Sequence, residues 1–63
     1  MPRFFVDSIS PADTTFVLTG EQAAHARVLR LKAGEQAVLC DGQGTDYQAV
    51  IRAVDASAVT VDI

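Results

Sequence analysis

The fold class follows from residues 36–63, which read QAVLC DGQGT DYQAV IRAVD ASAVT VDI. Residues 36–40 carry apolar side chains on both faces, which is typical of a buried strand. The Asp-Gly-Gln-Gly sequence at 41–44 is typical of a hairpin loop. Residues 47–54 and 58–63 alternate with a period of two, which is the period of a strand. This part of the chain therefore predicts three consecutive strands joined by tight turns.

Two further strands and one helix are predicted upstream. Residues 3–6 and 14–18 are rich in aromatic and β-branched side chains, which favour strands. Thr19 and Gln22 have the spacing of a capping box, in which each side chain satisfies a backbone N–H group near the other residue. The sequence accordingly predicts a helix over residues 20–29. Its apolar stripe is expected at Ala24, Val28 and Leu31.

The predicted element order is β-β-α-β-β-β, a mainly β fold with one short α-helix. Five short strands in so small a chain indicate a small antiparallel β-barrel, because closure of a sheet hides its edges. The residues expected in the core are Phe5, Leu18, Val28, Val38, Ile51 and Val61.

Length and composition describe one small globular domain, residues 1–63. The chain is 49% hydrophobic and 21% charged, which argues against disorder. No apolar run reaches the roughly 18 residues of a membrane span. The start of the chain does not have the form of a signal peptide, and Cys40 has no second cysteine to pair with, so a cytoplasmic location is expected. Ile63 falls within an expected strand, which indicates a fragment of a longer protein.

Charge is distributed unevenly along the chain, although the net charge is −3. Residues 1–32 carry a net charge of +1, whereas residues 33–63 carry −4. Residues 25–32 hold His25, Arg27, Arg30 and Lys32 and no acidic residue. A local basic segment of this kind attracts phosphate even on an acidic molecule.

Catalytic and metal-binding patterns are not found. The single histidine has no nucleophile beside it in a motif, and one histidine and one cysteine far apart do not make a metal site. Cys40 lies in a predicted buried strand and is interpreted as a core residue. Gly42 and Gly44 lack the third glycine and the following helix of a dinucleotide-binding loop.

The basic segment has two interpretations. At helical spacing Arg27 and Arg30 share one edge of the predicted helix, from which two guanidinium groups can grip successive phosphates. Alternatively, these residues form a solvated face whose positive charge complements the C-terminal end of the helix dipole. Spacing alone favours the second interpretation. Arg3, beside two phenylalanines, is either a phosphate contact or a charge that protects an edge strand from aggregation.

Four segments, in order and in spacing, resemble the N-terminal part of one family. They are Pro2-Arg3-Phe4-Phe5-Val6, the stretch from His25 to Glu35, Asp41-Gly42-Gln43-Gly44, and Tyr47-Gln48-Ala49. The family is RsmE, the bacterial 16S ribosomal RNA methyltransferases that modify N3 of a uridine. Many members have a pair of histidines where this chain has Ala24 and His25, which weakens any role that requires the pair.

The resemblance implies a PUA-like β-barrel that docks 16S rRNA. In the family a SPOUT methyltransferase domain follows, which binds S-adenosylmethionine and forms a homodimer. The resemblance therefore implies that this chain holds no catalytic residue and binds no cofactor itself. The matched positions expected to contact RNA are Arg3, His25, Arg27, Arg30 and Lys32. The alternative is a structural barrel that mediates contacts between domains or subunits and does not bind RNA directly.

Overall fold

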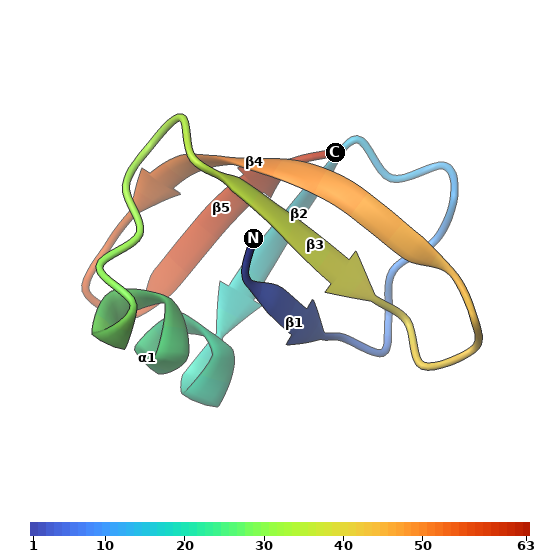
Figure 1. Ribbon diagram of the computed structural model, residues 1–63, viewed down its shortest axis with the longest axis horizontal. Helices are drawn as coiled ribbons and strands as arrows, with labels where there is room; N and C mark the ends of the chain where they lie inside the picture. Colours follow the sequence, from blue (N-terminus) through green and yellow to red (C-terminus); the bar gives the residue numbers. More distant parts are fainter.

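The computed structural model describes residues 1–63 and contains five strands and one helix (Figure 1). The elements are β1 (Arg3–Phe5), β2 (Thr15–Thr19), α1 (Gly20–Val28), β3 (Gln36–Cys40), β4 (Asp46–Val54) and β5 (Ala58–Asp62). The predicted order of elements is confirmed, and the predicted helix ends one residue too late. A helix of nine residues falls short of the length and apolarity that a membrane crossing requires.

The strands form one curled sheet in the order β1-β3-β4-β5-β2, a half-barrel whose edges are β1 and β2 (Figure 1). The β3–β4, β4–β5 and β5–β2 pairs are antiparallel, as predicted, whereas β1 pairs with β3 in parallel. A bulge between Ile51 and Ala53 in β4 shifts the register against β5 and adds local twist. The mainly β, PUA-like fold class is thus confirmed.

The core is entirely apolar and lies on the concave face of the sheet and beneath α1. Its largest fully buried side chains are Phe4, Leu18, Leu39, Ile51, Val59 and Val61. Four of the residues predicted for the core are buried, namely Leu18, Val38, Ile51 and Val61. The predictions for Phe5 and Val28 are wrong, because these side chains are 71% and 77% exposed.

Both errors have a geometric cause. Successive side chains of a strand point to opposite faces, and in β1 the buried one is Phe4, so Phe5 faces outward. Helix α1 packs against β2 and β5 through Ala23 and Ala26, and not through the predicted stripe, of which Ala24 and Val28 are exposed. Two alanines on one face let the helix backbone approach the sheet closely, and Val28 is then left on the outer side.

Helix α1 begins directly at the end of β2. Gly20 adopts a φ of 60°, a left-handed conformation that lets the chain turn from strand to helix without a loop. The predicted capping box is absent, because the Thr19 side chain makes no capping hydrogen bond. The Gln22 side chain instead donates to the backbone oxygen of Phe5. The helix thereby links the two edge strands of the open sheet.

The C-terminal end of α1 is closed by a Schellman motif. The Leu31 N–H donates to the Ala26 oxygen at 3.2 Å, and the Arg30 N–H donates to the Arg27 oxygen at 2.9 Å. Leu31 then packs against the core, as the predicted stripe required. Arg30 takes the left-handed position of the motif, with a φ of 58°, and therefore lies beyond the helix. The placement of Arg30 by helical spacing is wrong for this reason.

Candidate nucleic-acid interface

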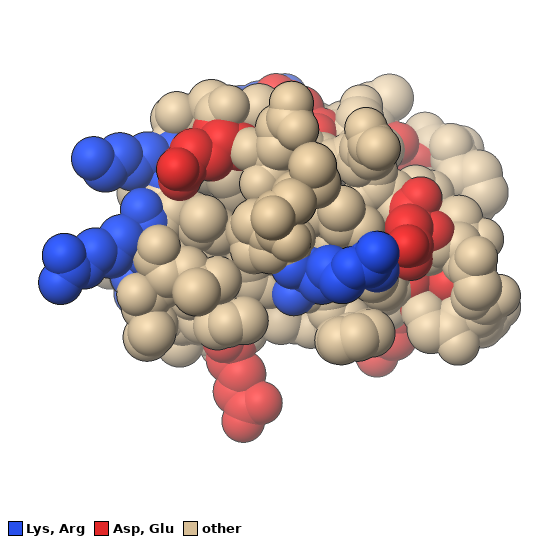
Figure 2. All heavy atoms as spheres, in the orientation of Figure 1, with Lys and Arg blue, Asp and Glu red and all other residues tan.

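Three of the five basic side chains have no acidic partner. The two ion pairs of the structure are Arg3–Asp46 and Arg52–Asp62. The unpaired residues Arg27, Arg30 and Lys32 lie in the last turn of α1 and in the segment that follows it. We call these three residues the basic patch. Figure 2 shows basic side chains projecting at the end of the molecule where Figure 1 places this segment.

The backbone holds Arg30 in a conformation that favours glycine. A left-handed conformation costs a residue with a side chain about 1–2 kcal/mol. Glycine is the usual occupant of this position in a Schellman motif. Strained residues of this kind concentrate at functional sites. The conformation turns the chain at Arg30 away from the helix axis. Arg27 therefore projects from helical backbone, whereas Arg30 projects from left-handed backbone just beyond the helix.

Lys32 begins a tight turn that Glu35 closes. The Glu35 carboxylate accepts a hydrogen bond from the Lys32 backbone N–H at 2.6 Å, and the Glu35 N–H donates to the Lys32 oxygen at 3.1 Å. The carboxylate is thus engaged by the backbone and forms no ion pair with the ammonium group. The positive charge of Lys32 remains available to a ligand.

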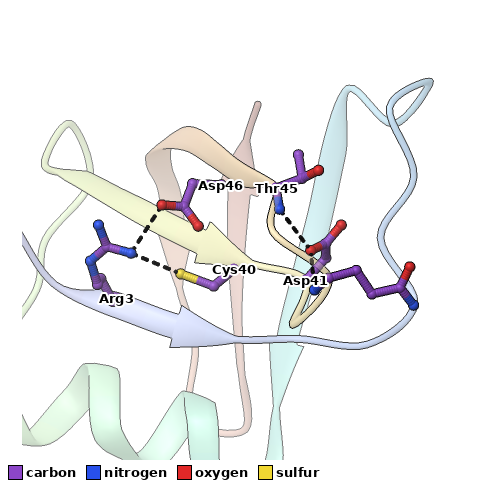
Figure 3. Close-up of polar contacts among 6 residues, drawn as sticks. Arg3, Cys40, Asp41, Thr45 and Asp46 are labelled. Atoms are coloured by element: carbon purple, nitrogen blue, oxygen red, sulfur yellow. Dashed lines mark hydrogen bonds and ion pairs between the residues drawn. The ribbon is translucent and has the colours of Figure 1, made fainter.

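Arg3 is committed to a contact within the protein (Figure 3). Its Nη1 atom donates to Asp46 Oδ2 at 3.1 Å and to Cys40 Sγ at 3.2 Å. Asp46 and Cys40 raise the pKa of Arg3 above its ordinary value. The Cys40 thiol and the Arg3 guanidinium hold the pKa of the Asp46 carboxyl below its ordinary range. Phosphate binding by Arg3 requires this guanidinium to share or leave Asp46.

His25 and Arg3 lie together in a groove between β1 and α1. One hollow, of about 370 Å³, is lined by these two residues with Phe4, Phe5, Glu21 and Gln22. A second hollow, of about 480 Å³, is lined by the same two residues with Met1, Pro2, Leu29 and Leu31. The two hollows adjoin each other, because Arg3 and His25 line both, and we call the two together the β1–α1 groove. The His25 ring meets the Phe4 ring edge-on, with 5.5 Å between the centroids.

The structure therefore places the five predicted residues in two adjoining groups. One group is the basic patch, which consists of Arg27, Arg30 and Lys32. The other group is Arg3 and His25, which line both hollows of the β1–α1 groove. Reasoning from the sequence did not identify Phe5 as a surface residue. The adjacent pair Phe4-Phe5 could have indicated its exposure, because two neighbours in a strand cannot both face the core.

Arg52 differs from the patch, because Asp62 on the neighbouring strand binds its guanidinium through two hydrogen bonds. Asp62 raises the pKa of Arg52 above its ordinary value. No group of three or more His, Cys, Asp or Glu side chains lies close enough to hold a metal ion. Cys40 is buried, as interpreted from the sequence.

The curled five-stranded sheet with its single helix places the chain in the class of small PUA-like β-barrels. Residues 18–63 match the family profile described as "RNA methyltransferase PUA domain". Because the match extends over most of the chain, the chain belongs to this family. No curated protein sequence matches at a significant level.

Solved structures support the same relationship. Ribosomal RNA small subunit methyltransferase E from Neisseria gonorrhoeae, bound to S-adenosylmethionine, superposes with a TM-score of 0.90 and 27% identity over 100% of this chain. A Legionella pneumophila protein described as a putative methyltransferase, also bound to that cofactor, superposes with a TM-score of 0.87 and 29% identity over 97% of this chain. A Thermotoga maritima protein at 22% identity and a TM-score of 0.80 shares the fold over 100% of this chain and 28% of its own.

The chain spans only a part of these relatives. It covers 26% of the Neisseria protein and 26% of the Legionella protein. The predicted relationship to the N-terminal, PUA-like part of the RsmE family is confirmed by the profile and by these structures. The cofactor in the two solved complexes belongs to proteins about four times as long as this chain.

Proposed function

We propose that residues 1–63 form the RNA-binding domain of a longer, S-adenosylmethionine-dependent ribosomal RNA methyltransferase. The observation that carries the proposal is the basic patch, three unpaired cations within residues 27–32 of a chain that belongs to an RNA methyltransferase PUA family. In the proposal the target is N3 of a uridine in 16S rRNA, and the RNA contacts are Arg3, His25, Arg27, Arg30 and Lys32.

The catalytic part of the proposed enzyme lies outside these residues. A methyltransferase domain of the SPOUT type would hold the cofactor and the reacting groups and would form the homodimer, in the cytoplasm. The support is that the cofactor-bound relatives are about four times as long as this chain. In this division of labour the 63-residue domain contributes affinity and orientation, not chemistry.

The geometry suits the phosphate backbone of RNA. A guanidinium group binds phosphate through two parallel hydrogen bonds, and a lysine supplies a flexible point charge. The hairpin between β3 and β4, which carries Asp41 and Asp46, lies at the other end of the molecule from the patch (Figure 1). A polyanion is therefore drawn to one end of the domain, although the net charge is −3.

The salt dependence of RNA binding tests the proposal. Each phosphate contact to single-stranded RNA contributes about −0.7 to the slope of log K against log salt, so three contacts predict a slope of about −2. Arg30→Ala is expected to weaken binding by about 1–3 kcal/mol and to make the slope shallower by about one contact. Fluorescence anisotropy of a labelled single strand at several salt concentrations measures both quantities.

The matched control is Arg52→Ala, which removes the same charge from an arginine already paired with Asp62. It is expected to change neither the affinity nor the slope. Equal affinities and equal slopes for the two variants would overturn the proposal. The alternative then applies, in which the domain is a structural barrel that contacts another domain or subunit.

A further inference from the structure

We propose that the β1–α1 groove holds unpaired bases of the RNA strand whose phosphates are bound by the basic patch; this inference rests on the proposed function. The groove adjoins the patch through the Schellman motif. Leu29 and Leu31 line the second hollow, and Arg30 stands between them in the chain. Because Arg30 is in a left-handed conformation, its side chain leaves the backbone in a different direction from those of Leu29 and Leu31. One turn of backbone thus presents apolar side chains to the groove and a guanidinium beside it.

The lining of the second hollow suits a nucleobase. It contains three large apolar side chains and a proline, with His25 and Arg3 as the polar groups, and no acidic residue. Bases stack on apolar, imidazole and guanidinium surfaces, and every base has a face for such stacking. Its volume of about 480 Å³ lies within the range typical of small-molecule sites, about 300–1,000 Å³.

Three large apolar side chains along the groove are exposed to solvent. Met1, Phe5 and Leu29 are 69%, 71% and 44% exposed, and all three line the groove. Contiguous exposed apolar side chains rimmed by polar ones mark interaction sites. The cations of the patch and of the groove favour a polyanion as the partner, and bases of a bound strand bring apolar faces to the same place.

Charge also sets the direction of the strand along the groove. Glu21 lies at the first hollow, beside Phe5, and repels phosphate there. The second hollow is lined by Leu29 and Leu31, the chain neighbours of Arg30, and by no acidic residue. Phosphates are therefore expected at the C-terminal end of α1, while bases extend into the groove and reach the exposed Phe5 ring.

An abasic strand separates base contacts from phosphate contacts. We expect the 63-residue chain to bind a uridine octanucleotide about tenfold more tightly than an abasic strand of the same length, because stacking contributes about 1–3 kcal/mol per base. Phe5→Ala and Leu29→Ala are expected to remove most of that difference and to leave abasic binding and the salt slope unchanged. Neither side chain belongs to the core or to the residues packed against it, so neither variant removes core packing.

The matched control is Val28→Ala, an apolar residue 77% exposed that lines neither hollow. It is expected to bind both strands as the unaltered chain does. Arg30→Ala is expected to lower the affinity for the uridine strand and for the abasic strand by the same factor, because both strands carry phosphates.

The possible failures can be told apart. Equal binding of the two strands, with the expected effect of Arg30→Ala, would overturn the groove proposal and leave RNA binding by the patch intact. Binding of neither strand, or binding indifferent to Arg30, would overturn both proposals. Concentration-dependent dimers that Phe5→Ala or Leu29→Ala abolish, with no difference between the strands, would assign the groove to a second copy of the chain.

Discussion

Arg30 occupies a backbone position that would suit glycine better, and this gives a direct way to separate stability from function. Arg30→Gly is expected to raise the free energy of unfolding by about 0.5–1 kcal/mol, because relief of the left-handed strain exceeds the entropic cost of glycine. The same variant is expected to weaken RNA binding as much as Arg30→Ala does. Urea denaturation and fluorescence anisotropy measure the two effects.

Arg30→Ala serves as the comparison, because alanine is strained in the same conformation and brings little gain in stability. A glycine variant that is more stable and binds RNA with undiminished affinity would show that the arginine side chain has no role in binding.

The pair of Arg3 and Asp46 leads to a second prediction at this scale. Asp46→Asn removes the charge that holds the Arg3 guanidinium at 3.1 Å and releases it toward the β1–α1 groove. RNA binding is expected to tighten, and the salt slope is expected to become steeper by about 0.7, one further phosphate contact. Anisotropy at several salt concentrations measures both.

Asp62→Asn is the matched control, because it makes the same change of charge and releases Arg52 instead. If both variants tighten binding equally, net charge alone governs affinity and Arg3 has no specific contact.

At the scale of the elements, the helix illustrates what hydrophobic patterns reveal and what they conceal. The bounds of α1 were predicted to within one residue, because Gly20 at its start and the polar turn after it limit its length. Its buried face was not predicted, because the large apolar residues suggested a stripe at Val28. The structure buries Ala23 and Ala26, whose small side chains allow close packing on β2 and β5.

Two neighbouring alanines test this assignment of the buried face. Ala23→Leu is expected to lower the free energy of unfolding by about 1–3 kcal/mol, because a larger side chain overfills the packed contact with the sheet. Ala24→Leu, on the exposed side of the same turn, is expected to change it by less than about 0.5 kcal/mol. Equal effects in thermal or urea unfolding would contradict the packing of α1 described above.

The polar contacts between elements were beyond prediction for a different reason. The sequence identified Gln22 as a capping residue, since local partners are the ones that spacing reveals. Its actual partner, the backbone oxygen of Phe5, belongs to another element and is brought near only by the finished fold. The left-handed conformation of Arg30 was likewise hidden, because nothing in the identity of an arginine indicates it.

For the whole molecule, the alternating strands were enough to predict a mainly β fold, because their pattern is local. The parallel pairing of β1 with β3 was not predicted, since it joins residues far apart in the chain. The basic segment was found from charge alone. Its division into a patch at the end of α1 and a groove beside β1 required the structure.

Charge polarity is the property of the whole molecule on which the proposed function depends. Figure 1 places the hairpin between β3 and β4 at the other end of the molecule from the segment of the basic patch, and Figure 2 shows basic side chains projecting at the patch end with an acidic side chain beside them.

Amide NMR spectra of the 63-residue chain, recorded during titration with single-stranded RNA, test this account most directly. The account predicts that the signals that move belong to residues 27–32 and to β1, whereas those of the hairpin loop at residues 41–45 stay in place. Movements confined to the outer face of β4 and β5, or no movement at low salt, would contradict it.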